Sequence, residues 1–279
     1  MKLAVLSDVH GNLPALEAVA EELLRWRPDR IVINGDLINR GPNSLACLQL
    51  LQRAFPTIEL LKGNHEEFVL SCAARDDHPH HPTFELRRFA HWTHAQLGEA
   101  MQQIAQWPDH LDEASLAGSL HITHASRRGK RDGISQRTTD EELAEKLGER
   151  RSLFITSHTH KPLIRRFDTT LIVNTGSVGS PSDHDPRAAY GRFQFDGHAW
   201  HAEIARIAFD RERALRDFSA SGFIEQGGAL TRLMREELRH ARIFVGPWNE
   251  RYLEAVLTGT IDVASAVQQF LADELGRQQ

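Results

Sequence analysis

The first third of this chain alternates short apolar segments with longer amphipathic ones. Residues 3–6, 31–33 and 58–61 consist largely of Leu, Ile, Val and Ala. Between them, residues 13–26 and 44–55 repeat apolar side chains at helical spacing. This βαβαβ order predicts a parallel sheet with right-handed crossovers. The loops that follow such strands gather at one edge of the sheet, where open α/β sheets bind their ligands.

The second half of the chain is expected to add strands that pair mostly antiparallel. Six segments have strand-like sequence: residues 119–123, 153–156, 163–167, 171–174, 190–195 and 199–204. Asp196 and Gly197 are a strong hairpin signal between the last two. A helix is predicted over residues 92–107, ended by Pro108. The simplest architecture is an α/β fold in which two mixed sheets pack face to face with helices outside.

From about residue 206 the pattern becomes helical and strongly charged. Four segments carry apolar residues at helical spacing: residues 211–219, 229–241, 249–257 and 261–275. We therefore expect a core domain over residues 1–205 and a helical C-terminal extension over residues 206–279 packed on it. The extension can be a lid, a dimerisation surface that makes a homo-oligomer, or a stabilising cover, and cover is the favoured interpretation.

Composition is typical of an ordinary globular protein of the cytoplasm. Of the 279 residues, 25% are charged and 41% hydrophobic, and the formal net charge of −5 argues against a general nucleic-acid binder. No signal peptide is visible, and no apolar run is long enough to cross a membrane. Cys47 and Cys72 are too few for a disulfide framework and are expected to be buried and reduced.

Residues 74–83 are polar and broken by proline, which predicts a flexible surface loop. Its histidines are His78, His80 and His81. They could bind a metal ion adventitiously, but a solvated loop is the favoured interpretation.

Five short polar pieces follow predicted strands and carry side chains that bind metals. They hold Asp8 with His10, Asp36, Asn64 with His65 and Glu66, His124, and His158 with His160. Carboxylates and imidazoles in this mixture suit divalent transition metals, and a paired-metal site implies phosphoester chemistry. Singly, each residue has an ordinary explanation as a turn, a helix cap or a buried histidine. Together, in order at strand ends, they predict a metal centre.

The order and spacing of these pieces resemble the calcineurin-like metallophosphoesterase superfamily, over roughly residues 1–205. The resemblance implies a four-layer αββα sandwich and two divalent metal ions. Mn²⁺ is the favoured ion, and Fe, Zn or Ni also suit these ligand types.

The expected ligands divide between the two ions. Strand-end geometry lets Asp8 and His10 hold one ion and lets Asp36 bridge both. With the resemblance added, the first ion has the ligands Asp8, His10, Asp36 and His160. The second ion has the ligands Asp36, Asn64, His124 and His158.

Three residues beside the metals have roles implied by the same resemblance. His65 corresponds to the general acid that protonates the leaving oxygen, a role that suits an imidazole. Arg40 matches the phosphate-clamping arginine of the protein-phosphatase and diadenosine-tetraphosphatase branches, although an ordinary surface arginine is the alternative. Those branches carry an aspartate immediately before this arginine, where this chain has Asn39. An amide can orient the ring of His65 but cannot stabilise imidazolium by charge, so we predict weaker support for His65 as an acid.

Other positions carry smaller expectations. Ser157 stands where the family usually has glycine and is expected to be tolerated. Glu66 is expected to help start the helix that follows it. The basic residues 127–131 can touch substrate phosphates or form a solvated loop, and the loop is slightly favoured. Residues 176–178 resemble a loop that shapes the site in the small phosphodiesterase group.

The leading hypothesis is a phosphohydrolase in which a metal-bridging hydroxide attacks phosphomonoesters or small phosphodiesters directly. Residues 7–18 resemble the bacterial small phosphodiesterase group, whereas residues 35–42 resemble the protein-phosphatase and dinucleoside-tetraphosphatase group. Hydrolysis of dinucleoside polyphosphates or phosphoproteins is therefore the second hypothesis. A non-catalytic scaffold on the same fold is the third, although no expected ligand is missing. The expected partner is a small phosphorylated substrate, with no stable nucleic-acid or membrane binding.

Overall fold

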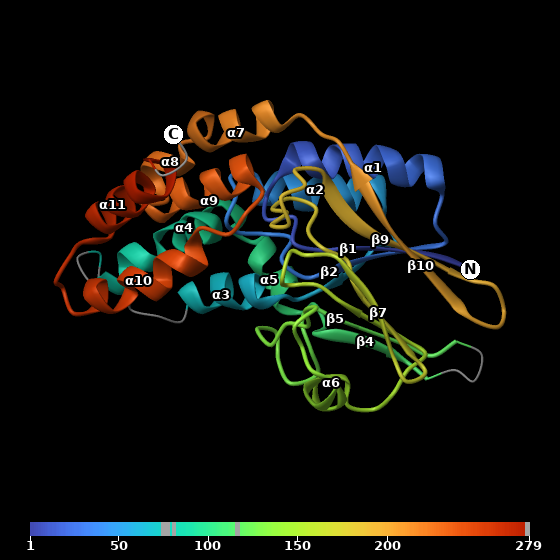
Figure 1. The fold of residues 1–279 in the computed structure, drawn as a ribbon. Helices are drawn as coiled ribbons and strands as arrows, with labels where there is room; N and C mark the ends of the chain where they lie inside the picture. The colour runs from blue at the N-terminus through green and yellow to red at the C-terminus, as the bar shows by residue number, and fades with distance from the viewer. Residues whose placement is uncertain (74–78, 80–81, 115–117, 277–279) are drawn as a thin grey trace.

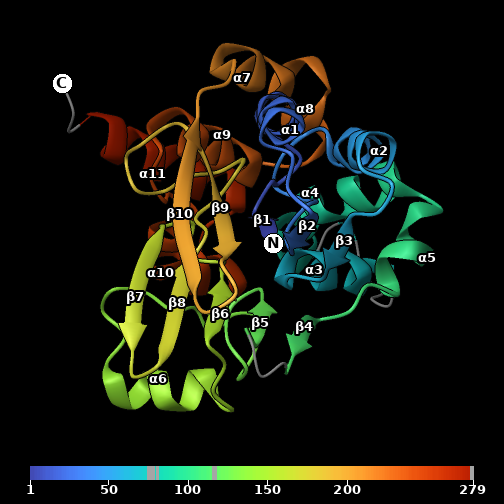
Figure 2. The same cartoon turned by 90° about the vertical axis from the view of Figure 1, so that its right-hand side faces the viewer.

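Two five-stranded mixed sheets pack face to face at the centre of the molecule (Figures 1 and 2). The computed structural model describes residues 1–73, 79, 82–114 and 118–276. The first sheet has the strand order β10-β9-β1-β2-β3 and consists of β1 (Lys2–Leu6), β2 (Arg30–Asn34), β3 (Glu59–Leu61), β9 (Ala188–Phe195) and β10 (Trp200–Ile207). The second has the order β4-β5-β6-β8-β7 and consists of β4 (His110–Glu113), β5 (Leu120–Thr123), β6 (Leu153–Thr156), β7 (Leu163–Phe167) and β8 (Thr170–Asn174).

The central strands are buried on both faces, which explains their continuous apolar sequences. In β1, Leu3 and Val5 pack between the two sheets, whereas Ala4 and Leu6 pack against helices on the outer face. Phe154 of β6 likewise points away from the first sheet, into a separate outer cluster. Because successive side chains of a strand point to opposite faces, each short apolar run contributes to two cores at once.

Helices cover the outer faces of both sheets, which confirms the predicted four-layer sandwich. Those against the first sheet are α1 (Leu13–Trp26), α2 (Ser44–Ala54), α3 (Asn64–Ala73), α4 (Pro82–Leu97) and α5 (Ala100–Ala105). The second sheet is covered by α6 (Asp140–Leu147), at the bottom of Figure 1. The predicted bounds of α1 are correct. Its N-cap is Asn12, whose side-chain oxygen accepts the N–H of Ala15 at 3.2 Å.

The predicted helix over residues 92–107 is wrong in its start and in its continuity. α4 begins earlier, at Pro82, and Gly98, with a φ of 51°, separates it from α5. Proline fits the first turn of a helix, whereas a left-handed residue cannot continue one. The predicted loop over residues 74–83 lies largely outside the described residues. The loop histidines that also lie outside them are His78, His80 and His81.

The strands of the second half pair mostly antiparallel, as predicted, and the exceptions lie at the centre of the second sheet. There β5, β6 and β8 run parallel, and the edge strands β4 and β7 run antiparallel to their neighbours. The β9–β10 hairpin joins the first sheet, where β9 pairs antiparallel with β1. β4 has a single apolar residue and gives no sequence signal. α6 is also absent from the prediction, although the capping box of Thr139 and Glu142 is a signal that could have found it.

The C-terminal extension is helical, as predicted, and shares an apolar core with the helices of the first sheet. It consists of α7 (Arg211–Ala220), α8 (Phe223–Gln226), α9 (Leu230–His240), α10 (Val245–Leu257) and α11 (Val263–Gly276). Trp248 and Phe270 belong to the same buried cluster as Leu16 of α1. Asn43, at the start of α2, donates its side-chain N–H to Asp217 of α7 at 2.9 Å. In Figure 1, α7 lies over α1, and the later helices gather around α4.

Candidate metal centre

The structure brings metal-ligand side chains together where the strand-end loops of both sheets meet. Two groups match the predicted ligand sets, Asp8, His10 and His160, and Asp36, His124 and His158, and within each the ligand atoms lie within 4.8 Å of one another. A third group that meets the same distance overlaps both and consists of His10, Asp36 and His65. Asp36 connects the first two groups, because its Oδ2 lies 3.8 Å from Nε2 of His10 and 3.3 Å from Nε2 of His124. Asn64 joins the second group through Oδ1, which lies 3.1 Å from Nε2 of His124.

The donor atoms of the first group fit a bound cation. Oδ1 of Asp8 is fully buried and accepts no hydrogen bond from the described residues. It lies 3.1 Å from Nε2 of His160, which itself faces Nε2 of His10 at 3.2 Å. An unpaired buried carboxylate oxygen is costly, and two imidazole nitrogens in contact can share only one proton. A cation between these atoms satisfies all of them.

The far ring nitrogens of two histidines support the same conclusion. Nδ1 of His124 lies 2.9 Å from the carbonyl oxygen of Asn34, and Nδ1 of His160 lies 2.6 Å from that of Ser180. A carbonyl accepts a hydrogen bond, so each Nδ1 carries a proton, and each Nε2 is the nitrogen left to face a metal, as metal-binding histidines require. Although burial opposes charge, Asp36 and Asp8 raise the pKa of His124 to about 10. In the protein without metal a proton on His124 therefore offsets these carboxylates.

Seven of the predicted site residues have a left-handed backbone conformation. Their φ values lie between 51° and 70°, at Asp8, His10, Asp36, Asn39, Arg40, His158 and His160. This conformation costs about 1–2 kcal/mol for a residue other than glycine. Backbone hydrogen bonds between the loops hold it, such as Asp8 N to the oxygen of Gly35 at 3.1 Å and His10 N to that of Asp36 at 3.0 Å. Strain of this kind clusters at functional sites, so the backbone supports a functional site independently of the ligand chemistry.

Glu66 organises the loops that carry Asp36 and Asn64. Its buried carboxylate accepts the backbone N–H groups of Gly63 at 2.7 Å, Asp36 at 2.8 Å, Leu37 at 2.9 Å and Ile38 at 3.3 Å. Burial and the nearby Asp36 raise the pKa of Glu66 to about 7, although the hydrogen bonds from Gly63 and Asp36 act to lower it. We call this set of four hydrogen bonds the Glu66 clamp. The sequence predicted only that Glu66 helps to start a helix, because the clamp involves a loop 30 residues away in the chain.

Two glycines let the same loops approach each other. A Cβ atom on Gly63 would lie 2.1 Å from Oδ1 of Asp36, and one on Gly35 would lie 2.6 Å from the Cα atom of Gly63. Neither position has room for a side chain.

Buried polar side chains join the two sheets behind the metal ligands. Asn34 donates to the carbonyl of Thr123 at 2.8 Å and to the hydroxyl of Ser157 at 3.0 Å. Ser157 is therefore integrated into a hydrogen-bonded network, which gives a physical reason for its expected tolerance. Ser177 donates to the carbonyl oxygen of Asp8 at 2.7 Å, so residues 176–178 shape the first ligand loop.

His65 lies beside both groups, with its ring oriented by Asn39. Nδ1 of His65 is 2.9 Å from Nδ2 of Asn39, and Oδ1 of Asn39 accepts from the hydroxyl of Thr93 at 3.2 Å. Burial lowers the pKa of His65 to about 3, with Arg40 and Arg131 acting in the same direction and Asp36 opposing them. The amide positions the ring but adds no charge that would favour imidazolium.

Replacing Asn39 by Asp is expected to strengthen His65 as an acid. Aspartate fits the left-handed backbone of residue 39 as well as asparagine does, and its charge raises the pKa of His65. A general acid is lost as pH rises through its pKa, so the alkaline limb of the rate profile should move to higher pH. Turnover of phenyl phosphate should rise more than that of p-nitrophenyl phosphate, which has the better leaving group. Unchanged pH profiles and unchanged rates for both substrates would refute this role of Asn39.

The basic segment over residues 127–131 mostly forms ion pairs with the protein surface. Arg127 contacts Asp112, Arg128 contacts Asp132 and Glu145, and Lys130 contacts Glu67 and Asp109. Arg131 alone of these basic residues lines the cleft over the metal centre.

A cleft of about 930 Å³ opens over the metal-ligand groups. Its described lining includes His65, His158 and His160 from the site and Asn249 from the C-terminal extension. The charged side chains in this lining are Arg40, Arg131, Arg137, Lys161, Arg242 and Glu237. With five cations and one carboxylate, the cleft favours anions. All ten predicted site residues thus gather at or beneath one cleft, although their roles stay predictions.

The chain belongs to the calcineurin-like phosphoesterase superfamily, because the family model for that domain matches residues 1–197. It is a metal-dependent phosphoesterase, a hydrolase of phosphoric ester bonds. Among the part of the chain that the structure describes, no helix is long and apolar enough to span a membrane.

Three comparisons illustrate the relationship. The crystal structure of a metallophosphoesterase from Sphaerobacter thermophilus is 25% identical, with a TM-score of 0.68, covering 86% of this chain and 99% of that one. Serine/threonine-protein phosphatase 1 of Salmonella typhimurium is 34% identical over 130 residues, which is 43% of this chain and 57% of that protein. The symmetrical bis(5'-nucleosyl)-tetraphosphatase of Chromohalobacter salexigens is 35% identical over 74 residues, 26% of this chain and 27% of that protein. The chain thus matches these two enzymes over less than two thirds of their lengths.

Proposed function

We propose that this protein is a dinuclear-metal phosphohydrolase that cleaves phosphomonoesters or small phosphodiesters. The observation that carries the proposal is the position of Asp36 between the two ligand groups, within 3.8 Å of His10 and 3.3 Å of His124. Mn²⁺ is the favoured ion, with Fe, Zn or Ni as alternatives for a site of carboxylate, amide and imidazole ligands. Two buried thiols, Cys47 and Cys72, support a cytoplasmic location.

Two ions bound in such a site supply Lewis acidity and an activated water for in-line displacement at phosphorus. The chain's own residues bind the ions and handle the proton and the substrate. Nδ1 of His65 is occupied by Asn39, which leaves Nε2 for proton transfer to the leaving oxygen. Arg40 lines the cleft and can donate guanidinium N–H groups to the non-bridging phosphate oxygens.

Hydrolysis of dinucleoside polyphosphates is the second candidate function. The observation that favours it is the cationic lining of the cleft, which continues beyond the metal ligands through Arg137, Lys161 and Arg242. A substrate with several phosphates would use this charge, whereas a simple monoester would not.

Removal and return of metal tests the proposal. Chelation is expected to reduce hydrolysis of p-nitrophenyl phosphate and its bis ester to background, and Mn²⁺ is expected to restore it. Metal should also raise the melting temperature, because a ligand that binds only the folded state stabilises that state. Fe, Zn and Ni, with diadenosine tetraphosphate as a third substrate, complete the panel. If no combination of ion and substrate restores hydrolysis, the proposed function is wrong.

A further inference from the structure

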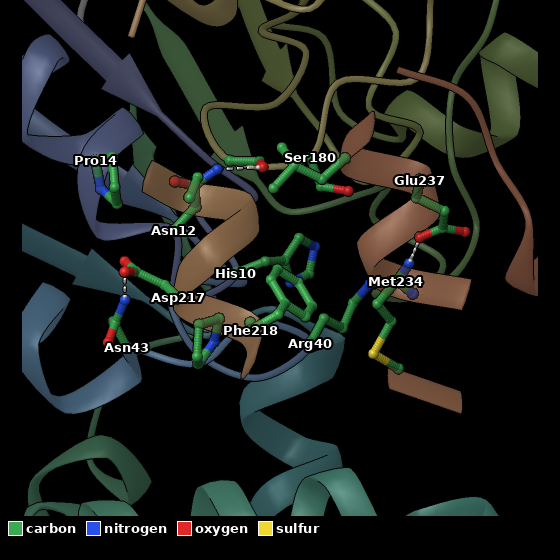
Figure 3. Close-up of a pocket in the computed structure, with 16 residues that line it drawn as sticks. His10, Asn12, Pro14, Arg40, Asn43, Ser180, Asp217, Phe218, Met234 and Glu237 are labelled. Carbon is green, nitrogen blue, oxygen red and sulfur yellow. Dashed lines mark hydrogen bonds and ion pairs between the residues drawn. The ribbon is translucent and has the colours of Figure 1, made fainter. Parts of the chain in front are cut away.

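The phosphate-binding candidate Arg40 is paired with a carboxylate from the C-terminal extension. Figure 3 shows Glu237 of α9 reaching Arg40, with a dashed line between Oε2 of Glu237 and Nη2 of Arg40. The two residues lie 197 positions apart in the chain. Both line the cleft over the metal centre, and Glu237 is the one carboxylate among the described residues that line it.

Glu237 is held rigidly in this position. Its side chain is only 4% exposed, and its Oε1 accepts the backbone N–H groups of Phe244 and Val245, each at 2.8 Å. Those two groups lie at the start of α10, so the carboxylate is fixed between two helices of the extension. A carboxylate anchored in this way cannot swing aside when an anion enters the cleft.

The contact changes what Arg40 can offer a substrate. A free guanidinium presents a planar fork that matches two oxygens of a dianionic phosphate. Here Glu237 occupies one nitrogen of the fork and cancels the charge of Arg40, and Nε of Arg40 is buried. The phosphate position beside Arg40 therefore has less positive charge than the cationic lining of the cleft suggests, and it has a fixed negative charge nearby.

We propose that Glu237 sets the charge preference of the site. It favours substrates whose attacked phosphate carries one negative charge, namely phosphodiesters and the internal phosphates of polyphosphate chains, over dianionic phosphomonoesters. This inference rests on the proposed function and specifies its substrate class. The helical extension thereby contributes a specificity-determining residue to a site whose metal ligands all come from the first 160 residues.

Glu237→Gln removes the negative charge and the acceptor for Arg40, while its remaining oxygen can still accept from Phe244 and Val245. The measurement is kcat/KM with Mn²⁺ for p-nitrophenyl phosphate and for its bis ester, above the second pKa of a monoester, about 6. The ratio of monoester to diester activity is expected to rise roughly tenfold, the scale of one like charge removed from a few ångströms away. Glu236→Gln is the matched control. Glu236 neighbours Glu237 on α9, pairs with Arg239 and His240, and does not line the cleft.

The outcomes separate this inference from the proposed function. An active wild type whose activity ratio is unchanged by Glu237→Gln overturns the inference alone. Equal losses on both substrates also overturn it, since Glu237 would then only position Arg40. A wild type inactive on both esters with every ion overturns the proposed function and this inference with it.

If Glu237→Gln does not fold, the double variant Arg40→Gln, Glu237→Gln holds an uncharged pair in the same place. Its monoester-to-diester ratio should exceed that of Arg40→Gln, and an equal ratio contradicts the inference.

Discussion

Asp36→Asn is expected to abolish turnover and metal binding together, whereas His65→Ala abolishes turnover with the metal retained. Asp36 lies in contact range of both ligand groups, so loss of its charge weakens the sites for both ions. His65 is close to the centre, but its Nδ1 is engaged by Asn39. Removal of a general acid typically costs about 10²–10⁴-fold in rate. Metal content by elemental analysis and kcat with Mn²⁺ distinguish the two variants.

A remote carboxylate provides the control for this pair. Glu145 is exposed and pairs with Arg128 on the surface, so Glu145→Gln should leave rate and metal content unchanged. If His65→Ala loses metal, His65 is itself a metal ligand and not a general acid. Its position permits this, because it lies close to His10 and Asp36. Full metal content in Asp36→Asn would contradict the bridging role.

Glu66→Ala is expected to lower the free energy of unfolding by about 3 kcal/mol or more, because it leaves four buried N–H groups without an acceptor. Urea denaturation of the metal-free protein measures this effect without a contribution from bound ions. The variant should also lose affinity for Mn²⁺, since its clamp holds the loop of Asp36.

The adjacent residue offers the comparison for that experiment. Glu67 is half exposed and pairs with Lys130 at the surface, so Glu67→Ala should change stability by at most about 1 kcal/mol. Equal stabilities for Glu66→Ala and Glu67→Ala would show that the four hydrogen bonds contribute little.

The bounds of helices and strands could be predicted where the segment's own sequence marks them. α1 has its predicted bounds because Pro14 in its first turn and a regular apolar stripe mark the helix within its own sequence. β6 and β7 also have their predicted bounds, but the parallel order of β5, β6 and β8 was missed. Pairing direction depends on crossovers between distant segments, and a strand's own sequence does not encode it.

The same distinction applies to the site. The sequence by itself determined which ligand types occur and that they follow strands, because each Asp or His lies within four residues of the end of a predicted strand. It did not reveal the clamp of Glu66 on the loop of Asp36, or the contact of Glu237 with Arg40. Those depend on loops and helices 30 and 197 residues apart, respectively, that meet only after the sheets and the extension have packed. Ligand identity is a property of short segments, whereas the charge around the phosphate position is decided by tertiary contacts between remote ones.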